Sequence, residues 1–389
     1  MMKTKRLIAI VLGALMTLSC FSGCGGGSGT AGSDANELMI GGAGPLTGSA
    51  AIYGIAVKNG AELAINEINE AGGVNGITFK LNFQDDENDA QKSVNAYNKC
   101  VDDGCKVFLG PVTSIPCVSV VEEAASNNMF LITPSATTKD CISSDNAVRV
   151  CFNDPNQGNA SAQYIADNNV AKKVAVIYDS SDVYSSGIYE TFDATAKEKG
   201  LEIVSVQSFT SSNNTDFSVA LQKISESGAE LVYLPFYYQQ AALVIQQAAK
   251  AGYDFKYFGC DGLDGLVKQL DADADLADGV MLLTGFAPDA SDEKSQAFVS
   301  AYEAAYDETP TQFAAASYDA IYAIKAALEK ADISDASISA SDLCDEILAV
   351  MTQITVEGVT GTITWGEDGE PNKDAKAVKI VDGAYQSMD

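Results

Sequence analysis

Apolar positions between residues 37 and 289 alternate between two spacings. Short apolar, β-branched runs are separated by stretches with apolar residues at helical spacing, such as 55–73, which ends at Gly72-Gly73. Short, apolar, β-branched strands separated by helices are typical of a parallel sheet covered on both faces. The pattern therefore predicts an α/β fold with parallel sheets flanked by helices. The predicted strands are 38–46, 77–85, 106–111, 130–134, 172–179, 201–209, 230–236, 256–260 and 279–288.

The strand–helix pattern occurs twice, which predicts two α/β units of about 120 residues each. Helical stretches then follow at 292–307, 311–331 and 341–354, before two predicted strands at 361–365 and 377–386. The simplest assembly returns these helices to the first unit, with crossings near 153–157, 284–287 and 356–361. The predicted lobe 1 is then 37–154 plus 286–358, and lobe 2 is 155–285 plus 359–389. Three crossings favour two lobes that move about a hinge.

The first residues predict export. A basic segment precedes the apolar run 7–18, whose twelve residues make about 18 Å of helix, too short for a membrane core of about 30 Å. Residues 1–23 are therefore predicted to be a lipoprotein signal peptide, and Cys24 to be the lipidated residue, because Ser22 and Gly23 precede it. Cys20 is the alternative. A Gly/Ser-rich tether, 24–36, leads to an extracytoplasmic domain anchored to the cell membrane by lipid.

Charge and residue usage exclude several functions. The net charge of −29 becomes −32 when Lys3, Lys5 and Arg6 leave with the signal peptide, which argues against binding to nucleic acid.

The chain has nine cysteines, and an odd number remains after Cys20 and Cys24 are set aside. A bridge between Cys141 and Cys151 is one option. The chain has no histidine and no CxxC pair, so we expect no zinc site. The acidic run 85–90 lacks EF-hand spacing and is interpreted as a solvated turn. We expect neither a metal nor a cofactor.

Catalysis is also disfavoured. Without histidine, Ser-His-Asp and Cys-His mechanisms are excluded. A hydrolase that pairs Ser135 with a lysine remains an alternative, but Lys139 beside Asp140 is typical of a solvated pair. The segment 44–54 lacks the Gly-Lys-Ser/Thr ending of a phosphate loop. We predict that the protein is not an enzyme.

The residues that follow the predicted strands form a coherent set. Ligands of open parallel sheets bind at the carboxyl ends of the strands. In the first unit these ends carry hydroxyl groups, which with helix N-termini suit a carboxylate, whereas in the second unit Asp261 suits an ammonium group. Tyrosines follow other strands and can surround an apolar side chain. The predicted ligand-binding residues are Tyr53, Ser114, Ser135, Thr137, Tyr184, Tyr237 and Asp261.

Several motifs occur in the order found in one known family. They are "GPLTGSAAIYG" (44–54), "AINEINEAGG" (64–73), "DDENDAQKSV" (85–94), "VFLGPVTS" (107–114), "FLITPSATT" (130–138), "FNDPNQG" (152–158), "DFSVALQKI" (216–224) and "GCDG" (259–262). Together they resemble the branched-chain amino-acid-binding family of periplasmic-binding-protein-like ABC solute receptors, which includes leucine/isoleucine/valine-binding proteins. The resemblance covers residues 37–385. It implies a type I periplasmic binding protein, with two Rossmann-like lobes joined by three hinge crossings.

The resemblance also implies residue roles and partners. Ser114 would hold the ligand carboxylate, Ser135 and Thr137 would meet the carboxylate and the ammonium group, and the three tyrosines would line the side-chain pocket. Asp261 stands where the family has a glutamate, and the family's disulfide has no counterpart because Thr113 replaces one cysteine. The implied protein is a monomer that captures an amino acid by hinge closure and delivers it to a membrane ABC permease. The alternatives are a sensor for an amino acid, amide or aromatic acid, and a structural lipoprotein.

Overall fold

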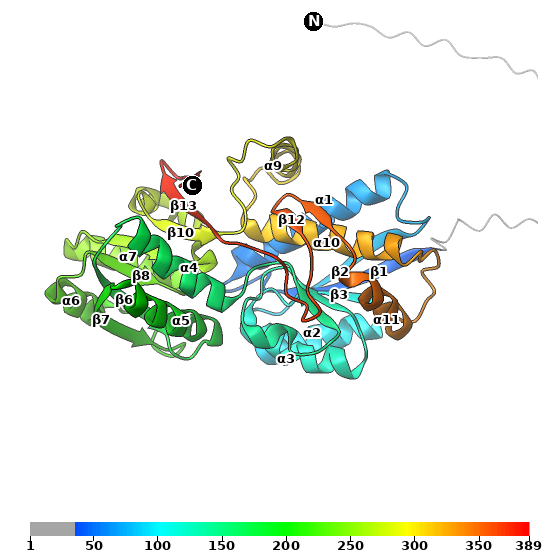
Figure 1. Ribbon diagram of the computed structural model, residues 1–389, viewed down its shortest axis with the longest axis horizontal. Coiled ribbons are helices and arrows are strands. Elements are labelled where there is room, and N and C mark those ends of the chain that lie inside the picture. Colours follow the sequence, from blue (N-terminus) through cyan, green and yellow to red (C-terminus); the bar gives the residue numbers. More distant parts are fainter. Residues whose placement is uncertain (1–35, 389) are drawn as a thin grey trace, which may run out of the picture. The chain divides into compact units, whose positions relative to one another are not determined.

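The computed structural model describes residues 36–388, which contain two large β-sheets with helices packed on them (Figure 1). The first sheet has the strand order β2-β1-β3-β4-β5, and all its pairings are parallel. Four of these strands were predicted and β5 was missed. The strands are β1 (Glu37–Gly44), β2 (Thr78–Asp85), β3 (Val107–Leu109), β4 (Leu131–Thr133) and β5 (Ala147–Arg149).

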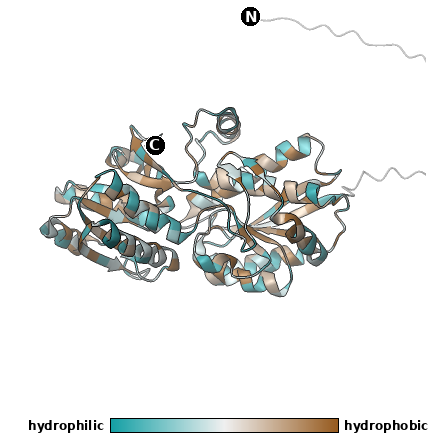
Figure 2. Cartoon of the chain, viewed as in Figure 1, coloured by the Kyte–Doolittle hydropathy of each residue, from teal (hydrophilic) through white to brown (hydrophobic). Residues whose placement is uncertain are grey.

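Both faces of the first sheet are buried at its inner strands β3 and β4, which explains their apolar residues, whereas the edge strand β2 carries polar residues and is mostly half-buried. Along β3, Val107 and Leu109 pack into one core and Phe108 packs into another on the opposite face. Figure 2 shows the apolar residues along the strands of both sheets. The helices of this half are α1 (Ala51–Glu70), α2 (Ala90–Asp102), α3 (Ser114–Ser126), α9 (Glu293–Tyr306), α10 (Gln312–Lys330) and α11 (Ala340–Met351), with the 3-10 turn η1 (Lys139–Ile142).

The second sheet has the order β14-β13-β10-β9-β8-β6-β7. Its pairings from β7 to β10 are parallel, but β13 and β14 are antiparallel, so the sheet is mixed rather than wholly parallel. Asp382 and Gly383 both have positive φ and make the tight turn between these two strands, as a two-residue hairpin requires. The strands are β6 (Lys173–Asp179), β7 (Glu202–Phe209), β8 (Leu231–Leu234), β9 (Lys256–Gly259), β10 (Met281–Thr284), β13 (Lys376–Val381) and β14 (Ala384–Ser387).

Helices complete the second half. They are α4 (Asp154–Asp167), α5 (Val183–Lys199), α6 (Ser218–Ser227), α7 (Tyr238–Ala251) and α8 (Leu266–Leu270), with the 3-10 turns η2 (Asp261–Leu263) and η3 (Asp271–Ala277). Within residues 36–388, no helix is both long and apolar enough to span a bilayer. The predicted signal peptide, Cys24 and all of the tether but Asn36 lie outside the described residues.

The chain passes between the two sheets three times. The passages follow β5, β10 and the small hairpin of β11 (Val356–Gly358) and β12 (Gly361–Ile363). Asp319 of α10 accepts hydrogen bonds from the amides of Val359 and Thr360, which holds this hairpin turn beside the first sheet's helices. The third passage therefore runs through residues 364–375. The lobe boundaries given above remain a prediction.

Candidate functional site

All seven predicted ligand-binding residues line one small cavity. The cavity lies at the carboxyl ends of strands from both sheets, where open α/β sheets bind ligands. A second small space shares Ser135, Asp261 and Phe313 with it. The cavity wall comprises Tyr53, Val112, Thr113, Ser114, Ser135, Thr137, Tyr184, Tyr237, Asp261, Gly262 and Phe313.

The first sheet contributes a polar wall made of two neighbouring loops. Ser114 is the first residue of α3, and its Oγ accepts hydrogen bonds at 3.3 Å from the backbone amides of Thr137 and Thr138. The Ser135 hydroxyl donates to the carbonyl oxygen of Val112 at 2.7 Å. Because that hydroxyl hydrogen is used within the protein, Ser135 can offer a ligand its backbone amide rather than a side-chain donor.

The N-terminus of α3 adds backbone donors to this wall. Its N-cap residue, Thr113, makes no capping hydrogen bond; its hydroxyl instead donates to Asn88 Oδ1 at 2.7 Å. The first amides of a helix have no partner within the helix, and the helix dipole favours an anion there. The wall formed by Ser114, Ser135 and Thr137 therefore suits a carboxylate.

Asp261 faces this wall from the turn after β9. Tyr184 donates a hydrogen bond from its hydroxyl to Asp261 Oδ1 at 2.6 Å, and the Asp261 amide donates to Gln157 Oε1 at 3.0 Å. Asp261 is only 5% exposed, and this burial raises the pKa of its carboxyl to about 6, although the Tyr184 hydrogen bond opposes the shift. A buried carboxylate held by a tyrosine can bind a cationic group on a ligand.

Aromatic rings make up much of the remaining wall. Tyr237 stacks on Tyr184 with ring centroids 5.0 Å apart, and Tyr53 stacks on Phe313 at 4.2 Å. Tyr53 also lies edge-on to Tyr237 at 5.5 Å. These rings provide an apolar surface between the two polar walls.

The sequence prediction missed Phe313 in the cavity wall and the buried Asp154, which lies outside that wall. Phe313 enters the cavity from the start of α10, so it follows no strand and carried no strand-end signal. Asp154 begins α4 and is buried, and burial raises the pKa of its carboxyl to about 8, with the nearby charge of Asp261 also raising it. Asp154 does have a sequence signal, because it follows the capping residue Asn153 and precedes Pro155 at the helix start.

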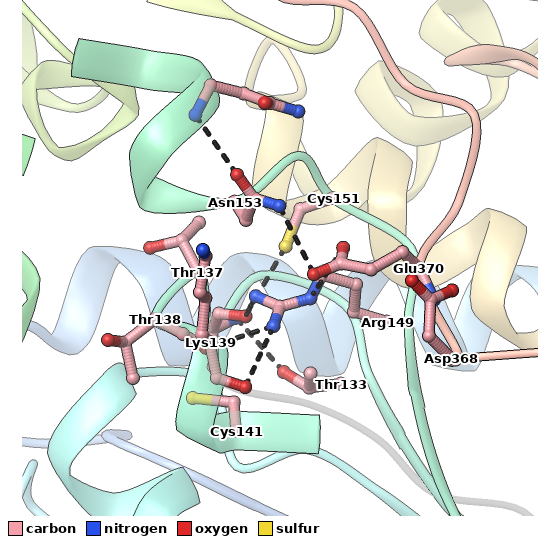
Figure 3. Close-up of polar contacts among 12 residues, drawn as sticks. Thr133, Thr137, Thr138, Lys139, Cys141, Arg149, Cys151, Asn153, Asp368 and Glu370 are labelled. Atoms are coloured by element: carbon pink, nitrogen blue, oxygen red, sulfur yellow. Dashed lines mark hydrogen bonds and ion pairs between the residues drawn. The ribbon is translucent and has the colours of Figure 1, made fainter. Parts of the chain in front are cut away.

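A fully buried arginine supports the loop that carries Ser135 and Thr137 (Figure 3). Arg149 donates to the carbonyl oxygens of Ala136 at 3.1 Å and Thr138 at 3.0 Å, and its Nε lies 3.2 Å from a Glu370 carboxylate oxygen. Glu370 belongs to the third passage between the sheets. Arg149 therefore joins the polar wall to that passage. Neither residue was predicted from the sequence.

Comparison with known proteins agrees with this architecture. The family model described as "Periplasmic binding protein" matches residues 37–384. The Leu/Ile/Val-binding protein homolog 3 of Brucella melitensis is 32% identical over 338 residues, covering 86% of this chain and 88% of that protein. The leucine-, isoleucine-, valine-, threonine- and alanine-binding protein of Pseudomonas aeruginosa is 29% identical, covering 86% of this chain and 87% of its own.

Solved structures agree as well. LivJ of Streptococcus pneumoniae, solved in complex with isoleucine, has a TM-score of 0.82 and 29% identity, covering 90% of this chain and 98% of that chain. LivK of Thermotoga maritima, a leucine-binding protein, has a TM-score of 0.81 and 26% identity, with the same coverage of each chain. The family consists of extracytoplasmic substrate-binding receptors. The predicted fold class is confirmed, and the chain belongs to the branched-chain amino-acid-binding members of the periplasmic binding protein family, with the type I fold.

Proposed function

We propose that this protein captures an amino acid with an apolar side chain, such as leucine, isoleucine or valine, and delivers it to a membrane ABC permease. The supporting observation is the arrangement of opposite polar walls in one cavity. Ser114 and its neighbouring amides lie on one side, and Asp261 lies on the other. A free amino acid carries a carboxylate and an ammonium group that fit these two walls.

The proposed roles follow from the contacts. Ser114, the amide of Ser135 and the hydroxyl of Thr137 bind the carboxylate, and Asp261 binds the ammonium group. Tyr53, Tyr184, Tyr237 and the newly found Phe313 surround the apolar side chain. The relatives named for leucine, isoleucine and valine support the same class of ligand. The protein binds without chemical conversion of its ligand.

Hinge closure is the proposed mechanism. The two walls belong to different sheets, and three chain passages link them. A ligand that contacts both walls favours the state in which they meet, and the permease then recognises that state.

We further propose that the protein acts as a monomer anchored through a lipid on Cys24. A Cys24→Ser variant should partition into the aqueous phase of a detergent extract, whereas the wild-type chain should follow the detergent.

The test separates the two ends of the ligand. Isothermal titration compares leucine with 4-methylpentanoate, which lacks the ammonium group, and with leucinamide, which lacks the carboxylate. We expect leucine to bind far more tightly than either analogue. Asp261→Asn should weaken leucine binding by about 30-fold or more, because removing one partner of a buried charge pair costs at least about 2 kcal/mol. The same change should not weaken 4-methylpentanoate binding.

Asp86→Asn is the matched control. Asp86 is also buried, and burial likewise raises the pKa of its carboxyl to about 6, but it does not line the cavity. Its substitution should leave leucine affinity unchanged. Equal binding of leucine by wild type and Asp261→Asn would show that Asp261 is not the ammonium partner. Tight binding of benzoate with no binding of amino acids would overturn the proposed ligand class.

A further inference from the structure

Two buried cysteines lie directly behind the polar wall of the cavity. Cys117 is in α3, the helix that begins with Ser114, and Cys141 is in η1, which follows the loop carrying Ser135 and Thr137. Neither side chain has measurable exposure. The two cysteines therefore lie in the two segments whose relative position shapes the wall.

The sulfur atoms make reciprocal contacts with the opposite segments. Cys117 Sγ lies 3.7 Å from the carbonyl oxygen of Cys141, and Cys141 Sγ lies 3.7 Å from the carbonyl oxygen of Ser114. Each thiol therefore lies against the backbone of the segment that carries the other cysteine or that begins its helix. A disulfide requires the sulfurs to approach to about 2 Å, and these reciprocal contacts place both sulfurs between the same two segments, where side-chain rotation can bring them together.

We propose that Cys117 and Cys141 form a disulfide that crosslinks α3 to the loop after β4. The bond forms by thiol–disulfide exchange with a small-molecule disulfide, such as oxidised glutathione. One cysteine thiolate attacks this disulfide and releases one small thiol, leaving a mixed disulfide. The second thiolate then attacks the cysteine sulfur of that mixed disulfide and releases the second small thiol. The two cysteines are oxidised, and one small disulfide is reduced to two thiols.

The location of the crosslink gives it a functional consequence. The Ser114 hydroxyl oxygen already accepts hydrogen bonds from the amides of Thr137 and Thr138, so the two loops meet at the wall. A covalent bond one layer below restricts their separation in the unliganded protein. Such pre-organisation lowers the entropy cost of ordering the wall around a ligand. It also closes a loop of about 25 residues, which restricts the unfolded chain.

Another cysteine pair provides an internal comparison. Cys100 and Cys105 form another buried pair at the end of α2, where both sulfurs contact Asn82, but neither lines the cavity. Crosslinking of that pair would not join the two loops of the polar wall. Peptide mapping distinguishes the two pairs because each yields a different linked peptide.

The experiment begins with refolding of the mature chain in oxidised or reduced glutathione. Free thiols are then alkylated in denaturant, and peptides are mapped without reduction. We expect a Cys117–Cys141 linked peptide after oxidation. Reduction should then lower the Tm by about 5 °C, and it should weaken leucine binding by about 3-fold. The map needs no ligand, so it tests the crosslink independently of the proposed function.

Two variants complete the design. Cys117→Ala should lose the linked peptide and most of the redox dependence of the Tm, compared within that variant between oxidised and reduced samples. Cys344→Ala removes a buried cysteine of α11. This variant should retain the linked peptide and the redox dependence of the Tm. Alkylation of both Cys117 and Cys141 in the oxidised wild-type chain would overturn the proposal. Linkage of either cysteine to a different partner would overturn it as well.

Discussion

Tyr53 donates a hydrogen bond from its hydroxyl to the carbonyl oxygen of Gly262 at 2.5 Å. Tyr53 lies in α1, which packs on the first sheet, whereas Gly262 lies in the turn after β9 of the second sheet. The amide of Gly262 in turn donates to the Tyr184 hydroxyl, which donates to Asp261. One chain of hydrogen bonds therefore runs from the first half of the molecule to the proposed ammonium site in the second.

Tyr53→Phe should weaken leucine binding by about 3–10-fold, because the variant loses two hydrogen bonds between the halves, one to the Gly262 carbonyl oxygen and one from the Tyr238 amide. Its ring can still stack on Phe313, so the apolar wall is retained. Isothermal titration measures the change. Tyr97→Phe is the control, since the Tyr97 hydroxyl accepts from Asn127 away from the cavity. Unchanged leucine affinity in Tyr53→Phe would show that these contacts do not support the bound state.

Leucine binding should weaken as the pH falls below about 6. Burial raises the pKa of Asp261 to about 6, and an ammonium ligand binds the ionised carboxylate. Below that pH the carboxyl must lose a proton before it pairs with the ligand, so the affinity should fall about tenfold per pH unit. Titration between pH 5 and pH 8 measures this slope. Asp261→Asn should bind leucine weakly, and its affinity should not depend on pH in this range. An equal pH dependence in that variant would show that another group titrates.

Asp154→Asn should stabilise the unliganded protein at pH 8 and have a smaller effect at pH 5. Burial raises the pKa of Asp154 to about 8, so the native state holds its proton more firmly than the unfolded chain does. The stability from this proton is fully present below the pKa of an unburied aspartate, and it is lost progressively as the pH rises from there to about 8. We expect the Tm at pH 8 to rise by about 3–5 °C.

Asp167→Asn is the control for that measurement. Asp167 is the last residue of the same helix, but its side chain is exposed and paired with Lys199. Its substitution should change the Tm little at either pH, because exposed ion pairs contribute little. A Tm for Asp154→Asn that follows the wild-type value at both pH values would contradict the assigned role of the buried carboxyl.

Glu370→Gln should destabilise the protein by about 1–3 kcal/mol, because Arg149 is fully buried and would lose its carboxylate partner. Chemical denaturation measures the free energy of unfolding. Leucine affinity should fall as well, since Arg149 holds the carbonyl oxygens of Ala136 and Thr138 in the polar wall. Glu308→Gln breaks the exposed pair with Lys268 and should cost less than about 1 kcal/mol. Similar costs for the two variants would argue against a supporting role for Arg149.

The sequence by itself determined most of the strands and helices, but not β5 or the division of 377–386 into β13 and β14, and it determined the positions where ligand-binding side chains leave the strands. The local spacing of apolar residues indicates which positions are buried, and the carboxyl ends of parallel strands lie at one edge of their sheet. The seven predicted residues therefore converge in one cavity. Their binding roles remain a prediction that the titrations address.

Only the tertiary structure decided which distant segments meet. Phe313 reaches the cavity from a helix returned to the first half, and Glu370 reaches Arg149 from the third passage. The antiparallel turn at Asp382-Gly383 and the contact between Tyr53 and Gly262 are decided at the same level. Periodicity reports how each segment is buried but not which segment buries it. These pairings depend on how the chain crosses between the sheets.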